Sequence, residues 1–228
     1  MMAGDMFASL VGALVSDAAA KENLALASVF GASFSGAIQA LRRKRLEEAR
    51  DILIEDVKIG NKDLNDAAQI EDVIACMLRY GRAAQEGAAR LNLRLLALTI
   101  NGMYSRSRLI SDEFMYFSDT LSSLRREEAI ILGVFQRHVF KLQDPANRRE
   151  EGFEIQKEVI GEIVPAYIGT VEEFYAYCGS ILRTGFLELV NGFGGSFYIT
   201  TPILDRLSKY ASIESALSRE AAKKETEL

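Results

Sequence analysis

The side chains best suited to catalysis or metal binding are scarce and scattered in this sequence. His138 is the single histidine and lies between apolar residues in GVFQRHVFKL, while Cys76 and Cys178 are the two cysteines. No Ser-His-Asp or Cys-His set can be assembled from them, and two cysteines so far apart do not make a zinc knuckle or a disulfide scaffold. We expect two buried thiols and a partly buried structural histidine, with no catalytic residue and no metal ligand.

Glycine-rich and acidic segments do not supply an active site either. The segment NGFGGS at 191–196 lies inside a predicted hairpin and not between a strand and a helix, where a phosphate-binding loop belongs. Paired carboxylates are adjacent in sequence, so on a helix they point in different directions. These pairs are Glu47-Glu48, Glu150-Glu151 and Glu172-Glu173. The sequence therefore predicts a protein that is not an enzyme and has no cofactor.

The elements that carry these residues are predicted to be mostly helical. Proline occurs only at 145, 165 and 202, and apolar residues make up 49% of the 228-residue chain. Such a composition is typical of a globular protein with a buried core. We expect a mainly α fold with an all-helical region over 1–120, a C-terminal module with one β-hairpin over 121–211, and a polar helix or tail over 212–228.

The charge of the chain argues against a nucleic-acid or anionic-lipid partner. Lys and Arg number 27 against 32 Asp and Glu, which gives a net charge of −5, and no segment forms a basic arm. The N-terminus lacks a basic region before its first apolar stretch, so a secretory signal is not expected. We expect a cytoplasmic protein, with peripheral attachment to the inner membrane as the alternative.

One β-hairpin is predicted near the C-terminus. In 186–200, FLELVNGFGGSFYIT, alternating apolar residues flank Asn191-Gly192 and Gly194-Gly195. Pro202 is placed to begin the helix that follows. Residues 181–207 therefore read as a helix end, a strand, a glycine turn, a second strand and a new helix.

This order of elements resembles the winged-helix superfamily over residues 124–211. The matching positions are Leu182, Gly185, Phe186, Tyr198, Thr201, Pro202 and Leu207. The resemblance implies a C-terminal winged-helix-like module of the kind that usually binds DNA, with 170–184 as its recognition helix. The candidate residues for a nucleic-acid or partner surface are Tyr175, Tyr177, Arg183, Asn191 and Phe193.

The charge of this module favours a protein partner over DNA. Over 165–211 the bases are Arg183, Arg206 and Lys209, against four acids, and the wing turn has no Lys or Arg. A protein that reads duplex DNA relies on several phosphate contacts from basic side chains. We expect protein–protein contacts or a homo-oligomer, and DNA binding is the alternative.

A second unusual segment is 24–41, LALASVFGASFSGAIQAL, which has no charged residue and precedes a basic cluster at 42–45. One interpretation is a membrane-lying or self-associating helix with the basic cluster on the cytoplasmic side. The other is a soluble helix buried on most sides, which the serines, Gln39 and the two glycines favour. The residues of this candidate membrane or self-association surface are Leu24, Phe30, Gly31, Phe34, Gly36, Arg42, Arg43, Lys44 and Arg45.

Further predictions concern helices in the middle of the chain. Charges recur every four residues at Arg82, Glu86, Arg90 and Arg94. They would form one helical stripe, either a phosphate-binding ridge or, as we favour, a solvated face of paired charges. Ser122-Ser123 is expected to cap the helix that starts LRREEA, and Thr170 to cap a later one.

The layout of the whole chain resembles the bacterial abortive-infection alpha family. A small-residue N-terminal region, a helical middle, the helix start from Leu121 to Ala129 and a winged end carry the resemblance, whereas the family's aspartate- and tryptophan-bearing signature is missing. It implies a non-enzymatic anti-phage or toxin-related protein. Three hypotheses follow: an adaptor in phage defence or stress response, a DNA-binding transcriptional regulator, and a membrane-associated effector that uses residues 24–45.

Overall fold

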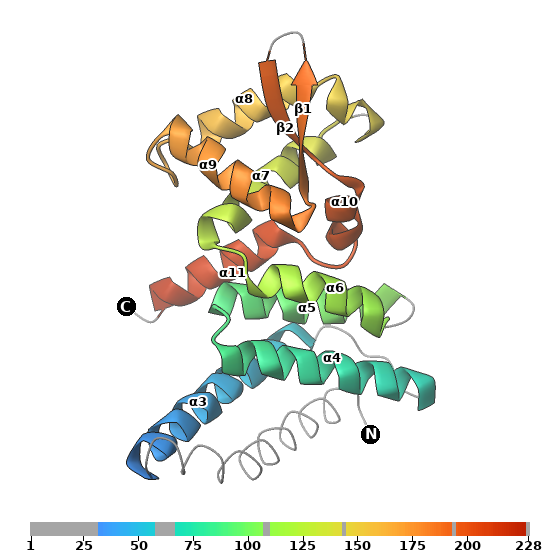
Figure 1. Ribbon diagram of the computed structural model, residues 1–228. Helices are drawn as coiled ribbons and strands as arrows, with labels where there is room; N and C mark the ends of the chain where they lie inside the picture. The colour runs from blue at the N-terminus through green and yellow to red at the C-terminus, as the bar shows by residue number, and fades with distance from the viewer. Residues whose placement is uncertain (1–31, 58–66, 107–109, 143–144, 193–194, 227–228) are drawn as a thin grey trace. The chain divides into compact units, whose positions relative to one another are not determined.

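The computed structural model describes residues 32–57, 67–106, 110–142, 145–192 and 195–226 (Figure 1). Over these residues the fold is mainly α-helical, with one two-stranded antiparallel hairpin near the C-terminus. This confirms the predicted fold class of a mainly α chain with a C-terminal hairpin. The chain divides into two compact units, Met1–Ser123 and Leu124–Leu228.

Four helices build the described part of the first unit: α3 (Ala32–Val57), α4 (Ala67–Glu86), α5 (Arg90–Arg106) and α6 (Ser111–Ser122). The leucine-rich helix α5 packs against the other three, and α4 also contacts α3 and α6. Because α5 is enclosed in this way, nearly all of its first two turns are buried. The core contains large apolar side chains from every helix, including Leu53, Met77, Leu95, Phe114 and Phe117.

The boundary between α4 and α5 contradicts the predicted charge stripe. Gly87 adopts a left-handed conformation (φ 96°) after α4, where a residue with a Cβ would be strained. Arg45 of α3 donates a hydrogen bond to the Gln85 carbonyl oxygen at 3.2 Å, so a cation covers the C-terminal end of α4. The exposed Arg82–Glu86 pair, 3.6 Å apart, does lie on a solvated helix face. The predicted stripe, however, is divided between two helices.

Arg94 departs furthest from the predicted solvated face, because its side chain is fully buried. Its guanidinium lies 3.4 Å from the Asp56 carboxylate and 3.2 Å from the Glu55 carboxylate at the end of α3. Asp56 is also fully buried, and the Asn101 side-chain amide donates to its carbonyl oxygen at 3.1 Å. A charge is stable in a protein interior only with such partners. The ion pair therefore connects α3 to α5.

Helix α7 is the centre of the second unit, and almost every residue from Glu128 to Val139 is buried. Helices α8, α9, α10 and α11 pack against it, as do strand β2 and the short turn η1. The bounds of these elements are Arg126–Phe140 for α7, Pro145–Arg149 for η1, Gly152–Ile163 for α8, Val171–Ile181 for α9, Pro202–Ser208 for α10 and Ile213–Thr226 for α11. The C-terminal segment, predicted as a polar helix or tail, is thus the helix α11, which buries Ile213 and Ala216.

The hairpin forms at the predicted place. Strands β1 (Leu187–Gly192) and β2 (Gly195–Thr200) pair from Leu187 opposite Thr200 to Gly192 opposite Gly195. Gly185, with φ 70°, ends the 3-10 turn η2 (Leu182–Thr184) that leads into β1. Pro202 occupies the start of α10, as the sequence predicts.

The start of α7 differs from the prediction that Ser122-Ser123 would cap it. These serines end α6 instead, where the Ser123 hydroxyl donates to the Thr120 carbonyl oxygen at 3.0 Å. Helix α7 is capped by Glu128, whose carboxylate accepts the Arg125 backbone N–H at 2.9 Å. A glutamate inside the first turn therefore performs the capping that the sequence analysis assigned to the serines.

Replacing Arg94 with methionine is expected to lower the free energy of unfolding by about 3–5 kcal/mol, because the buried Asp56 carboxylate loses its counter-ion. The matched variant Arg82→Met breaks an exposed pair and is expected to cost less than about 1 kcal/mol. Urea unfolding followed by circular dichroism measures both variants. Similar losses for the two would contradict the structural role of the Arg94–Asp56 pair.

Candidate functional site

Helix α9 packs through a narrow inner face and leaves most of its other residues exposed. The residues buried at helical spacing are Phe174, Cys178 and Ile181. The Phe174 ring stacks on Phe135 of α7 with 6.3 Å between the ring centroids. The Thr170 hydroxyl accepts the Glu173 N–H at 3.2 Å, which confirms the predicted cap. These contacts fix α9 on α7 and leave Tyr175 on the outside.

Tyr175, Tyr198 and Leu189 form a continuous row of partly exposed side chains, here called the apolar strip. The Tyr175 and Tyr198 ring centroids are 6.4 Å apart, which joins α9 to β2. Leu189 of β1 is directly opposite Tyr198, and residues opposite each other in an antiparallel pair share one face of the sheet. Tyr175 is 40% exposed and Leu189 46% exposed, so the strip is open to a partner.

The buried side chain of Gln156 connects the apolar strip to α8. Its Oε1 accepts the Tyr198 backbone N–H at 2.8 Å, and its Nε2 donates to the Tyr175 hydroxyl at 3.4 Å. Burial raises the pKa of the Tyr198 hydroxyl above its usual 10, so this group stays protonated at neutral pH. Because Gln156 accepts the Tyr198 backbone N–H, this N–H group is not available to pair with a partner strand. A partner would therefore be recognised here by side chains.

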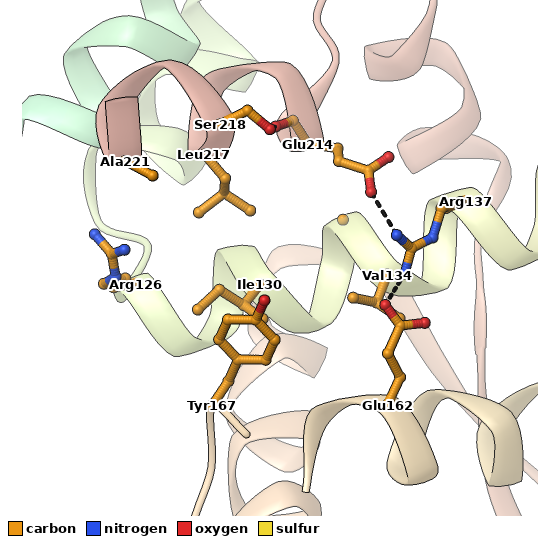
Figure 2. Close-up of a pocket in the computed structure, with 11 residues that line it drawn as sticks. Arg126, Ile130, Val134, Arg137, Glu162, Tyr167, Glu214, Leu217, Ser218 and Ala221 are labelled. Atoms are coloured by element: carbon orange, nitrogen blue, oxygen red, sulfur yellow. Dashed lines mark hydrogen bonds and ion pairs between the residues drawn. The ribbon is translucent and has the colours of Figure 1, made fainter. Parts of the chain in front are cut away.

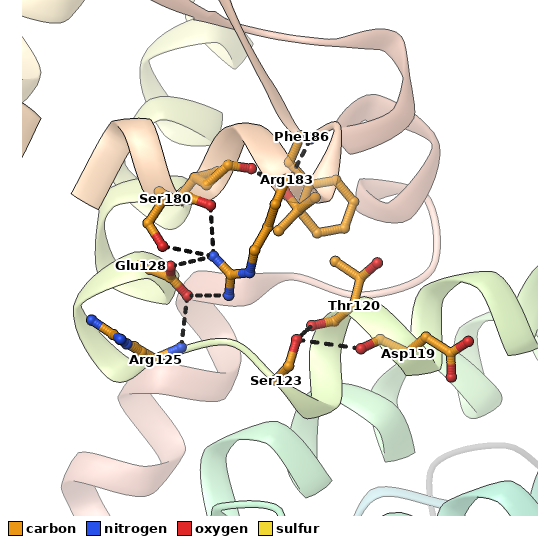
Figure 3. A network of polar contacts seen from close by, with 10 residues as sticks. Asp119, Thr120, Ser123, Arg125, Glu128, Ser180, Arg183 and Phe186 are labelled. Atoms are coloured by element: carbon orange, nitrogen blue, oxygen red, sulfur yellow. Dashed lines mark hydrogen bonds and ion pairs between the residues drawn. The ribbon is translucent and has the colours of Figure 1, made fainter. Parts of the chain in front are cut away.

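Arg183 is the base that DNA recognition by α9 would use, but it is neutralised within the unit (Figure 3). Its guanidinium nitrogens lie 2.6 and 2.9 Å from the two carboxylate oxygens of Glu128 and also donate to Ser180. Burial alone would raise the pKa of Glu128, but hydrogen bonds from Arg183, the Arg125 N–H and Ser180 outweigh it and hold this pKa below the usual 4.5. The hydrogen bond to Glu128 in turn raises the pKa of Arg183.

The remaining residues of the predicted partner surface are dispersed. Tyr177 is half-buried on α9, and the exposed Asn191 accepts a hydrogen bond from the Ser196 hydroxyl at 2.7 Å. Phe193 lies outside the described residues. Leu189 and Tyr198 were not predicted to belong to this surface. The alternation in FLELVNGFGGSFYIT is the signal that could have found them, since it places Leu189 and Asn191 on one face of β1.

The predicted membrane or self-association surface is only partly covered by the described residues. Leu24, Phe30 and Gly31 lie outside them, whereas Phe34 and Gly36 belong to the start of α3. Gly36 is exposed. None of the helices in the described part of the chain is both long enough and apolar enough to cross a bilayer.

The four basic residues at 42–45 differ in exposure. Arg43 and Lys44 are exposed, while Arg42 and Arg45 are half-buried. Arg45 is the residue that donates to Gln85 at the end of α4. One of the four bases therefore serves the packing of the first unit.

His138 lies between two carboxylates of α8, with Nδ1 2.8 Å from Glu158 and Nε2 3.2 Å from Glu162. A carboxylate only accepts hydrogen bonds, so both contacts are hydrogen bonds only in the doubly protonated imidazolium. Arg137 binds Glu162 and Glu214, which joins α7 to α8 and α11. This cluster connects three helices and leaves neither histidine nitrogen open to a substrate.

The two cysteines are buried, as predicted. Burial raises the pKa of the Cys76 thiol to about 12, with a smaller contribution from the charge of Asp72, and burial also raises the pKa of Cys178. Neither thiol is a reactive thiolate at neutral pH. Within the described ranges, no group of three or more His, Cys, Asp and Glu side chains is placed to hold a metal ion.

Replacing Glu128 with glutamine is expected to reduce the loss of stability in acid. Because its folded-state pKa is lowered, ionised Glu128 stabilises the fold above its unfolded-state pKa, and this contribution is progressively lost as the pH falls below about 5 and through the lowered folded-state pKa. The unfolding free energy of the wild type should therefore fall more over this window than that of Glu128→Gln. Urea unfolding at several pH values measures the slopes, and the exposed Glu154→Gln serves as the control. Equal slopes for all three proteins would contradict the pairing of Glu128.

Comparison with protein-family models, with curated proteins and with solved structures finds no match to this chain. The resemblances to the winged-helix superfamily and to the abortive-infection alpha family therefore stay predictions.

Proposed function

We propose that this chain is a non-enzymatic adaptor that binds a protein partner on the surface formed by α9 and the hairpin. The observation that carries the proposal is the apolar strip, which exposes Tyr175 and Leu189 on a packed scaffold. Partly exposed aromatic side chains on a rigid support are typical anchors of protein interfaces. The adjacent base, Arg183, is already engaged by Glu128.

The charges around the apolar strip support a polypeptide partner over a nucleic acid. Glu172 and Glu173 are exposed in the first turn of α9, and Glu172 lies one helical turn before Tyr175. A DNA backbone would meet these carboxylates without the several Lys and Arg contacts that phosphate binding requires. A partner segment with an apolar side chain flanked by Lys or Arg complements both the strip and the acidic start of α9.

The ionisable groups of the second unit support a binding role and not catalysis. His138 has a carboxylate at each ring nitrogen, and the Cys178 thiol is kept protonated by burial. The proposal includes a cytoplasmic setting. The layout that resembles the abortive-infection alpha family supports a role of such an adaptor in phage defence or stress response.

A photo-crosslinking amino acid at Leu189 tests the proposal in cells. We expect one defined polypeptide adduct at Leu189 and none at Lys209, an exposed control position after α10. Tyr175→Ala should reduce the Leu189 adduct about tenfold, because truncation of an interface anchor typically weakens the binding free energy by about 1–2 kcal/mol.

Three other outcomes would redirect the assignment. Adducts to a second copy of this chain alone would identify a homo-oligomer surface. An equal adduct at Lys209 would show that the capture is non-specific. Salt-dependent binding of duplex DNA, without any protein adduct at Leu189 and lost in an Arg183→Gln variant that circular dichroism shows to be folded, would overturn the proposal in favour of a DNA-binding regulator.

A further inference from the structure

A pocket of about 220 Å³ lies in the second unit between α7, α11 and the segment after α8 (Figure 2). Ile130 and Val134 form its floor, because residues one turn apart on α7 point to the same side. Leu217 and Ala221 of α11 lie across from this floor, and the Tyr167 ring borders the remaining side. The middle of the pocket is therefore apolar.

The two ends of the pocket differ in charge. At one end Arg137 is held between Glu162 and Glu214, 2.7 Å from the Glu214 carboxylate, so its charge is balanced. At the other end lies Arg126, the exposed first residue of α7. Within the part of the chain that the structure describes, no carboxylate is paired with Arg126. The two arginines are about 16 Å apart along the helix axis.

We propose that this pocket binds a small amphipathic carboxylate. Its apolar body would lie against Ile130, Val134 and Leu217, and its carboxylate would bind Arg126. A guanidinium matches a carboxylate geometrically, because two parallel N–H groups can donate to two oxygens. The volume is below the roughly 300–1,000 Å³ of sites for drug-sized ligands, so the ligand has a single ring or a short alkyl chain.

Other ligand classes complement the pocket less well. A primary amine would meet Glu162 and Glu214, which Arg137 already engages. A phosphate ester carries about two negative charges, whereas Arg126 supplies one positive charge at its end of the pocket. Residues of α9 and the hairpin do not line the pocket. The inference therefore goes beyond the adaptor function and does not depend on it.

Three probes with the same phenylpropyl body separate the effect of charge from that of shape. They are 3-phenylpropanoate, 3-phenylpropanamide and 3-phenylpropylamine, titrated into the full-length chain and followed by backbone amide chemical shifts. We expect saturable shifts in α7 and α11, with the carboxylate bound at least about fivefold more tightly than the amide. The amine should bind most weakly.

Variants of exposed residues locate the site. Arg126→Gln should remove the preference for the carboxylate, so that carboxylate and amide bind equally. Ala221→Phe should fill the pocket and weaken all three probes. The matched control Ala222→Phe places the same ring about 100° further around α11 and should leave binding unchanged. Circular dichroism verifies that each variant is folded.

Several results would overturn the proposal. These are equal binding of carboxylate and amide to the wild type, tighter binding of the amine, and a carboxylate preference that survives in Arg126→Gln. The absence of saturable shifts at probe concentrations up to about 10 mM, or shifts confined to elements other than α7 and α11, would do the same. Arg126→Gln alone decides the question if Ala221→Phe does not fold, because Arg126 is exposed and outside the core.

Discussion

The second unit depends on the hydrogen bonds and the ion pair made by the buried carboxylate of Glu128. It accepts the Arg125 N–H at the start of α7 and binds Arg183 after α9, so a single side chain joins the central helix to the segment that leads into the hairpin. A buried charge is tolerated only when its hydrogen-bonding capacity is satisfied. Glu128 therefore needs both the Arg125 N–H and the Arg183 guanidinium. The same contacts balance the positive charge of Arg183, so this residue is not available to bind a DNA phosphate. The packing of the core thereby favours the proposed protein partner.

The first unit contains the reverse arrangement, in which the buried cation Arg94 is held by Asp56 and by the more exposed Glu55. Replacing a buried ion pair by apolar residues of similar size is often neutral or stabilising, so such pairs are weak contributors to net stability. We interpret this pair as specifying which face of α5 meets the end of α3. Apolar contacts alone would discriminate poorly between neighbouring leucine-rich faces of α5.

Helix α7 supports both surfaces to which binding is assigned. Phe135 packs under α9 through its stacking on Phe174, whose ring in turn contacts Tyr175 of the apolar strip. Ile130 and Val134, on another side of the same helix, line the pocket. The two surfaces differ in chemistry, because one exposes a tyrosine and a leucine beside acidic residues whereas the other offers an apolar cavity beside Arg126. A polypeptide and a small carboxylate are accordingly the ligands proposed for them.

The sequence by itself determined part of the local structure. The alternation and glycines of 186–200 predicted the hairpin, Pro202 the start of α10 and Thr170 the cap of α9, because these signals act between residues a few positions apart. Tertiary structure decided the burial of Arg94, whose partner Asp56 is 38 residues away, and the neutralisation of Arg183 by Glu128, 55 residues away. It also brought Tyr175 next to Tyr198. Backbone preferences are encoded locally, whereas the choice of partner for a charge or a ring depends on which distant faces pack together.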